Sequence, residues 1–165
     1  MSRAVLSIGS NIEDRLAHLQ LAVDGFAAEL ITVSAVFQTP PWGVTEQAPF
    51  LNAILIAEDP AATPADWLAR AQACEEKAGR VRVERWGPRT LDVDVIAVDD
   101  VRSDDPTLTL PHPRAAERAF VLVPWWSADP EAVLPGHGPV LNLIQRLPAG
   151  EADAVQLRFG LELRR

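Results

Sequence analysis

The sequence predicts an α+β fold in which helices pack on an antiparallel sheet, followed by an irregular C-terminal extension. Three observations support this prediction. Apolar runs and two amphipathic stretches follow in the order β-α-β-β-α-β, turn residues separate them, and prolines punctuate the chain after residue 100. With 165 residues, the chain suits one domain, residues 1–165, that can bury its core without disulfides or a structural metal.

The first predicted elements are a buried strand and an amphipathic helix. Residues 4–8 are apolar apart from Ser7 and are followed by Gly9, which indicates the strand. Ser10 and Glu13 have the spacing of a capping box, so we expect the helix to begin after Ser10. Apolar residues then recur at helical spacing, at Leu16, Leu19, Val23 and Phe26.

Two further strands are predicted next. Residues 31–37 are rich in β-branched side chains and alternate apolar with polar positions for most of their length. Residues 39–49 contain prolines, which fix the backbone and remove hydrogen-bond donors, so this segment is predicted to be a loop. Residues 50–57 form the third strand, in which one face carries Phe50, Asn52, Ile54 and Ile56.

The second helix has a complete start signal, with Thr63 as the N-cap, Pro64 at the first helical position and Asp66 at the third. Residues 91–98 form the fourth strand, which completes the element order of a ferredoxin-like fold. In the remainder of the chain we expect short helices packed on the sheet. Alternation over residues 155–163 indicates one more strand.

Composition argues against several classes of protein. The net charge of −8 is unlike the basic footprint of a nucleic-acid binder. No apolar run approaches the roughly 18 residues needed for a membrane span, and the start of the chain does not resemble a signal peptide. We therefore expect a cytoplasmic protein that binds neither nucleic acid nor membranes. The single cysteine, Cys74, lies on the apolar side of the second helix, where packing is its expected role.

The segment RWGPRTLDVDV, residues 85–95, combines arginines with two carboxylates. Side chains alternate faces along a strand, so Asp92 and Asp94 are expected to project together. Aligned carboxylates suit Mg²⁺, which also takes ligands from substrate phosphates. Residues 80–89 contain four arginines and one glutamate, a net charge of +3 in an acidic chain. Although Asp-x-Asp alone is more often structural, the combination indicates a small phosphorylated ligand.

Seven short motifs are spread along the chain from residue 9 to residue 120: Gly9-Ser10-Asn11, Thr39-Pro40-Pro41-Trp42-Gly43, Phe50-Leu51-Asn52, Gly79-Arg80-Val81-Arg82, the run from Arg85 to Asp94, Pro111-His112-Pro113 and Arg118-Ala119-Phe120. In their order and spacing they resemble the 6-hydroxymethyl-7,8-dihydropterin pyrophosphokinase family, which moves diphosphate from ATP to a pterin alcohol. Two residues depart from common family patterns, because Phe50 replaces a tyrosine and Thr107 an arginine.

This resemblance implies a site for ATP and magnesium. Asp92 and Asp94 look like the ligands of two Mg²⁺ ions on the ATP phosphates, and Arg82 and Arg89 look like catalytic partners that neutralise phosphate charge. His112 resembles a triphosphate contact, although a lone histidine is more often structural. The full set of implied ATP contacts is Glu75, Arg82, Arg85, Trp86, Arg89, Ile96, Thr109, His112 and Arg118.

The resemblance also implies a pterin pocket. Phe50 and Phe120 look like the two rings that sandwich the pterin, and Asn52 offers a donor and an acceptor to its edge. Without the resemblance, core packing is the commoner role of such aromatic residues. The full set of implied pterin contacts is Thr39, Pro40, Trp42, Phe50, Asn52, Asp92 and Phe120.

The implied reaction is direct in-line attack of the pterin's hydroxymethyl oxygen on the β-phosphorus of ATP, which releases AMP without a covalent enzyme intermediate. We expect a monomer whose partners are these small-molecule substrates. A P-loop kinase or ATPase is one alternative, but the chain has no Gly-x-x-x-x-Gly-Lys run followed by Ser or Thr. A non-enzymatic ferredoxin-like binding module is another, and fold alone does not separate it from an enzyme.

Overall fold

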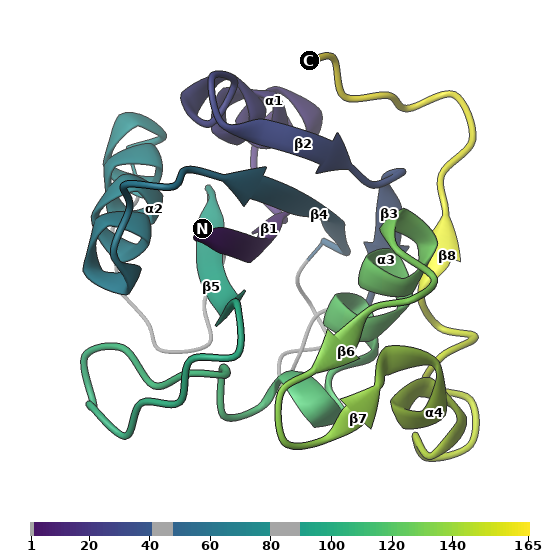
Figure 1. The fold of residues 1–165 in the computed structure, drawn as a ribbon. Coiled ribbons are helices and arrows are strands. Elements are labelled where there is room, and N and C mark those ends of the chain that lie inside the picture. The colour runs from purple at the N-terminus through teal and green to yellow at the C-terminus, as the bar shows by residue number, and fades with distance from the viewer. Residues whose placement is uncertain (1, 41–47, 80–89) are drawn as a thin grey trace.

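The computed structural model describes residues 2–40, 48–79 and 90–165. Within this part of the chain, no helix is long and apolar enough to cross a membrane. The elements in chain order (Figure 1) are β1 (Arg3–Ser10), α1 (Arg15–Gly25), β2 (Leu30–Val33), β3 (Phe37–Thr39), β4 (Phe50–Glu58), α2 (Pro64–Lys77), β5 (Asp92–Val98), a 3₁₀ helix (Ala115–Glu117), α3 (Ala119–Ala128), β6 (Val133–Leu134), β7 (Gly138–Pro139), α4 (Val140–Gln145) and β8 (Gln156–Leu157).

The main sheet has the strand order β5-β1-β4-β3-β8, and β2 also pairs with β4. Every pairing in it is antiparallel. β1 lies between β4 and β5, so the first and last strands of the βαββαβ core are neighbours. This arrangement confirms the predicted ferredoxin-like fold.

Helices cover both faces of the sheet (Figure 1). Under α1 and α2 lies one hydrophobic cluster, which includes Leu6, Leu55 and Trp67. On the other face, α3 and α4 pack over a second cluster, which includes Ile54 and Ile96. The strands therefore bury side chains on both faces, and we refer to the α3 side of the sheet as the site face because the predicted site residues of β4 and β5 alternate onto it.

The start of α2 is as predicted, and the start of α1 is not. Thr63 Oγ1 accepts a hydrogen bond from the Asp66 backbone N–H at 3.2 Å, and the Asp66 carboxylate accepts from the Thr63 N–H at 2.8 Å, which completes the capping box. At α1 the cap is Asp14, whose carboxylate accepts from the Ala17 N–H at 3.1 Å. Ser10 cannot cap this helix because it is still paired with β4, and its hydroxyl lies 3.3 Å from His18 Nδ1.

The predicted strand over residues 31–37 is divided into β2 and β3. Ser34 interrupts it, because its hydroxyl accepts a hydrogen bond from the Ile54 N–H at 2.8 Å and donates to the Ala35 carbonyl at 2.8 Å. The register on β4 differs by one residue between Val33 opposite Leu55 and Phe37 opposite Asn52. The extra residue places Phe37 and Thr39 where they can meet the site face.

The C-terminal segment forms less strand than predicted. Short helices follow β5 as expected, but of residues 155–163 only Gln156–Leu157 pair with β3. The chain then crosses α1, where Gln20 binds the Arg164 backbone. Its Oε1 accepts from the Arg164 N–H at 2.8 Å, and its Nε2 donates to the Arg164 carbonyl at 2.6 Å. The predicted longer strand ends at a turn, in which Gly160 has a φ of +85° and the Leu161 N–H donates to the Arg158 carbonyl at 3.4 Å.

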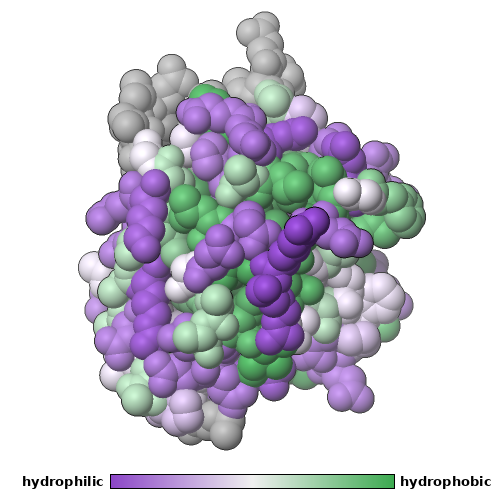
Figure 2. Space-filling view, turned by 90° about the horizontal axis from the view of Figure 1, so that it is seen from above, coloured by the Kyte–Doolittle hydropathy of each residue, from purple (hydrophilic) through white to green (hydrophobic). Residues whose placement is uncertain are grey.

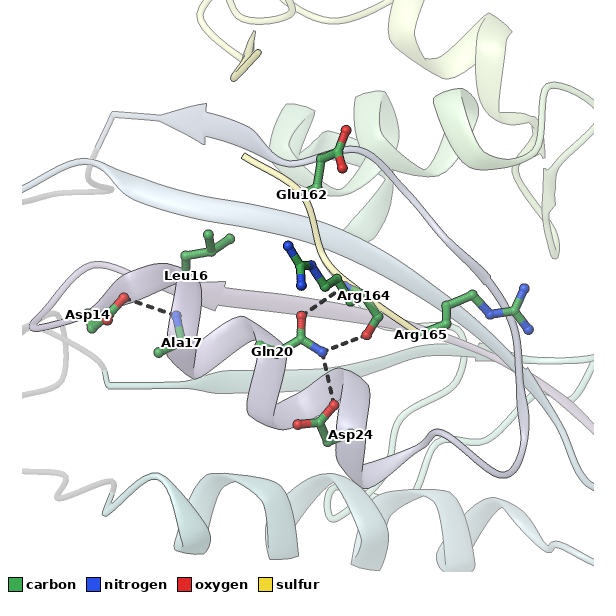
Figure 3. A pocket seen from close by; sticks show the side chains of 8 residues that line it. All are labelled: Asp14, Leu16, Ala17, Gln20, Asp24, Glu162, Arg164 and Arg165. Carbon is green, nitrogen blue, oxygen red and sulfur yellow. Dashed lines mark hydrogen bonds between the residues drawn. The ribbon is translucent and has the colours of Figure 1, made fainter. Parts of the chain in front are cut away.

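A groove of about 520 Å³ lies where the C-terminal segment crosses α1 (Figure 3), and it contains none of the predicted site residues. Seen from above, the surface shows hydrophobic side chains between hydrophilic ones (Figure 2). The mixed lining of the groove and the contacts of Gln20 with the Arg164 backbone indicate that the groove is where the C-terminal segment is attached to α1. The lining residues are Asp14, Leu16, Ala17, Gln20, Asp24, Glu162, Arg164 and Arg165.

Cys74 packs where α1 and α2 touch. Its side chain is buried, and a Cβ added at Gly25 would lie 2.7 Å from Cys74 Sγ. Burial raises the pKa of the Cys74 thiol, which keeps it in the unreactive protonated form. The expected packing role is therefore confirmed.

Candidate active site

Asp92 and Asp94 project from β5 onto the site face. Val93 and Val95 belong to the cluster under α1 and α2, so the two aspartates alternate to the opposite side, as predicted. On β1, Gly9 lies opposite Asp92 and Ser7 lies opposite Asp94. The Asp94 side chain is 42% exposed, so it can reach a ligand while its backbone stays within the sheet.

Arg118 brings a cation to this pair of carboxylates. It is the residue directly before α3, its Nη1 lies 4.0 Å from Asp94 Oδ2, and its guanidinium lies 5.4 Å from the centre of the Phe120 ring. Burial lowers the pKa of Arg118, while Asp94 and Asp92 raise it. A guanidinium remains charged under such conditions, so Arg118 can pair with a phosphate beside the carboxylates.

His112 is held beside Arg118 in its neutral form. Its backbone N–H donates to the Ile96 carbonyl at 2.8 Å, and its Nδ1 accepts from the Arg114 N–H at 3.2 Å. Burial, with smaller contributions from Arg118 and Arg114, lowers the pKa of His112 to about 4. Because Nδ1 is an acceptor, the proton of the neutral ring sits on Nε2, which can donate to an anionic ligand.

The pKa of His112 predicts a pH dependence of stability. A histidine whose pKa is about 4 when folded, against roughly 6.5 unfolded, opposes folding as the pH falls below 6.5. Relative to His112→Asn, whose amide oxygen can replace Nδ1, the wild type should lose about 1–2 kcal/mol between pH 7 and pH 4.5, with allowance for partial exposure. Urea unfolding of both proteins at these pH values measures the difference, and parallel pH profiles would contradict the prediction.

A second group of predicted residues lies on the site face in β3 and β4, in one row across the strands with Gly9 and Asp92. Asn52 is paired with Gly9 on one side and with Phe37 on the other. Thr39 Oγ1 donates to Asn52 Oδ1 at 2.7 Å. Since Gly9 is also opposite Asp92, the carboxylates and the Asn52 amide are separated by a single strand.

The predicted aromatic residues flank this row. Phe50 begins β4 and is half-buried, and a Cβ at Gly9 would lie 3.5 Å from its Cδ1. Phe120 packs against the cluster that contains Phe37. The structure therefore brings Phe50, Asn52, Asp92, Arg118 and Phe120 onto one face near the start of α3.

The remaining predicted contacts differ in their surroundings. Glu75 on α2 is buried, and its Oε2 accepts from the Val93 N–H at 3.0 Å, between the two aspartates of β5. The Ile96 side chain is fully buried in the core. Thr109 donates its hydroxyl to the Asp105 carbonyl at 3.1 Å, and Pro40 is exposed. Five further predicted contacts lie outside the described residues: Trp42, Arg82, Arg85, Trp86 and Arg89.

Two side chains near the site were given no role from the sequence, although Asn11 belongs to the first of the seven motifs. Arg15 Nη1 donates to the Pro49 carbonyl at 2.8 Å, and Asn11 Nδ2 donates to the Ala48 carbonyl at 3.2 Å. Both fasten the chain just before Phe50. Only tertiary structure reveals this role for Arg15, because no motif links it to residues more than thirty positions away.

The donor chemistry of the site fits magnesium delivered with a substrate. Asp92 and Asp94 offer hard oxygen ligands on one face, which suits Mg²⁺. Among the residues that the structure describes, no group of three or more His, Cys, Asp or Glu side chains could hold a metal. Two carboxylates are sufficient where phosphate oxygens and water complete the coordination shell.

Residues 5–130 match the family 7,8-dihydro-6-hydroxymethylpterin-pyrophosphokinase (HPPK). The 2-amino-4-hydroxy-6-hydroxymethyldihydropteridine pyrophosphokinase of Mycobacterium tuberculosis is 48% identical over 95% of this chain and 90% of its own length. The protein of the same name from Mycobacterium leprae is 48% identical over 100% of this chain and 94% of its own.

A solved structure supports the fold independently. The wild-type HPPK-DHPS of Plasmodium falciparum aligns with a TM-score of 0.61 and 13% identity, over 87% of this chain. The chain spans 43% of that longer protein, and at this identity the likeness concerns the fold alone. The family match and the close, nearly full-length relatives show that the chain belongs to the 7,8-dihydro-6-hydroxymethylpterin-pyrophosphokinase family.

Proposed function

We propose that the site on the α3 side of the sheet carries out the reaction of this family, the transfer of a pyrophosphoryl group from ATP to the hydroxymethyl group of 6-hydroxymethyl-7,8-dihydropterin. The observation that carries this proposal is the grouping of Asp92, Asp94 and Arg118 beside the row formed by Gly9 and Asn52. A phosphate site and a site for a flat polar ring would then adjoin, as direct transfer requires.

We propose that the pterin oxygen attacks the β-phosphorus of ATP in line and that AMP leaves. Arg118 would pair with phosphate oxygens, and neutral His112 would donate from Nε2. Arg82 and Arg89 are assigned the same charge-neutralising role from the sequence. Phosphoryl transfers of this type depend mainly on positioning and charge stabilisation. A protein nucleophile is therefore not required.

We propose Asp92 and Asp94 as the residues that hold two Mg²⁺ ions with the ATP phosphates. Bound there, Mg²⁺ would neutralise phosphate charge and orient the reacting groups. Glu75 supports this strand by accepting the Val93 N–H between the two aspartates. Glu75, Arg85, Trp86, Ile96 and Thr109 complete the proposed ATP contacts.

We propose that the ring of the pterin lies between Phe50 and Phe120. Asn52 would then bind its edge, with Asp92 reaching from the neighbouring strand. Thr39, Pro40 and Trp42 complete this proposed pocket. Stacking on two aromatic faces suits a flat bicyclic substrate, since each aromatic pair contributes roughly 0.5–1.5 kcal/mol beyond burial.

We also propose that residues 1–165 act as one monomeric, cytoplasmic domain. Its substrates would be small molecules, with no nucleic acid or membrane as a partner. The net charge of −8 supports the absence of nucleic-acid binding.

The test is AMP formation from MgATP with and without 6-hydroxymethyl-7,8-dihydropterin. AMP that appears only with the pterin, in a one-to-one ratio with the diphosphorylated product, is the expected result. ADP as the product, or no nucleotide turnover by folded protein, would contradict the proposal. The binding-module alternative would then be favoured.

A further inference from the structure

Thr39 and Asn52 make a buried hydrogen bond on the site face. Thr39 Oγ1 donates to Asn52 Oδ1 at 2.7 Å, and the two residues are only 5% and 3% exposed. A bond in this position is difficult to break, because the buried polar groups would be left without partners. The oxygen end of the Asn52 amide is therefore held toward β3.

The nitrogen end of the same amide lies over Gly9. A Cβ added at Gly9 would lie 2.8 Å from Asn52 Nδ2, closer than such atoms approach in folded proteins. The missing side chain of Gly9 is thus what leaves room for Nδ2. The register places Gly9 between Asn52 and Asp92, so Nδ2 occupies the side of Asn52 that faces the carboxylates.

Charge favours this orientation over the reversed one. A side-chain amide can exchange the positions of its oxygen and nitrogen by rotation, and the two orientations offer opposite hydrogen-bonding patterns. A hydroxyl can pair with either end of an amide. The carboxylates of Asp92 and Asp94 decide between them, because they attract the positive N–H end and repel the carbonyl oxygen.

We propose that Thr39 is a positioning residue whose hydroxyl, together with the space above Gly9, holds the Asn52 amide so that Nδ2 presents its N–H donors to the substrate ring. The pocket then selects flat heterocycles that carry a carbonyl or an unprotonated ring nitrogen at that edge. This inference rests on the proposed function, since it concerns the ring that the site binds.

Thr39→Val removes the hydroxyl with little change in shape. We expect the KM for the pterin to rise about tenfold, while kcat and the KM for MgATP change less than twofold. Thr39→Ser keeps the hydroxyl and should recover most of the loss. Thr32→Val, the same substitution on β2 outside the site, is the matched control and should leave the pterin KM at the wild-type value.

A double-mutant cycle shows whether Thr39 acts through Asn52. In an Asn52→Ala background, Thr39→Val should add less than a twofold further effect on the pterin KM. A full additional tenfold effect would mean that Thr39 contacts the substrate independently, which would overturn the inference. Gly9→Ala displaces Nδ2 from the other side and should also raise the pterin KM, with its folding checked by thermal unfolding.

The wild-type assay separates failure of this inference from failure of the proposed function. Wild-type protein that forms no pterin-dependent AMP overturns the function and the inference together. An active wild type whose Thr39→Val variant has an unchanged pterin KM overturns the inference alone. Without any ligand, the side-chain NH₂ resonances of Asn52 should shift in Thr39→Val and not in Thr32→Val, and unchanged resonances would also overturn it.

Discussion

Asp94→Asn is expected to lower the rate of pterin-dependent AMP formation by about 10³-fold at saturating MgATP. The substitution keeps the shape of the side chain but removes the negative charge that a hard cation requires. It also removes the carboxylate that lies 4.0 Å from Arg118. Initial rates of AMP release in wild type and variant measure the effect.

Stability should not follow activity in this variant. Asp94 shares one face of β5 with Asp92, and two nearby carboxylates repel each other, so the repulsion that the substitution relieves offsets the loss of the ion pair with Arg118. Asp100→Asn, in the exposed turn after β5, is the matched control and should retain wild-type activity. A folded Asp94→Asn protein with more than a tenth of the wild-type rate would exclude Asp94 as an essential ligand.

Trp67→Ala is expected to lower the free energy of unfolding by about 3–5 kcal/mol. Trp67 is fully buried on α2. Its ring stacks against Phe26 with the ring centres 6.3 Å apart, and its Nε1 donates to Ser2 Oγ at 2.8 Å. Arg70 lies over the ring at 4.9 Å from its centre. The substitution removes all of these contacts and opens a cavity between α2 and the sheet, as urea unfolding at pH 7 should show.

A second tryptophan provides the control. Trp126 on α3 is 37% exposed, so Trp126→Ala should change the free energy of unfolding by less than about 1 kcal/mol. Because Trp67 packs on the face opposite Asp92 and Asp94, the folded fraction of Trp67→Ala should keep its activity per molecule at low temperature. A loss of less than 1 kcal/mol would show that the α2 face repacks around the gap.

The sequence predicted those features that depend on local periodicity. Alternation along residues 92–98 placed both aspartates on one face, since a strand repeats every two residues. The capping box at Thr63 was also predictable, because its partners are three residues apart. At α1 the same pattern misled, since pairing of Ser10 with β4 displaced the start of the helix to Asp14.

Contacts between distant segments could not be predicted from the residues alone. Arg118 meets Asp94 because α3 folds back onto the sheet, and nothing in the local pattern of either residue specifies that approach. The family resemblance supplied their shared role, while the structure supplied the distance. The bond from Thr39 to Asn52 likewise depends on the extra residue between Val33 and Phe37, which sets the register of β3.

The strand order implies that β1 and β3, which carry Gly9 and Thr39 on two sides of the proposed pterin pocket, differ in how readily their backbone amides exchange hydrogen with water. β1 is paired along both edges, with β4 through eight positions and with β5 through six. Amides in such a strand exchange chiefly through global unfolding. β3 has three residues, and only two of them pair with β8, so it can open locally. The backbone of β1 at Gly9 therefore keeps its shape. The backbone of β3 at Thr39 is the part of the site whose hydrogen exchange substrate binding can slow.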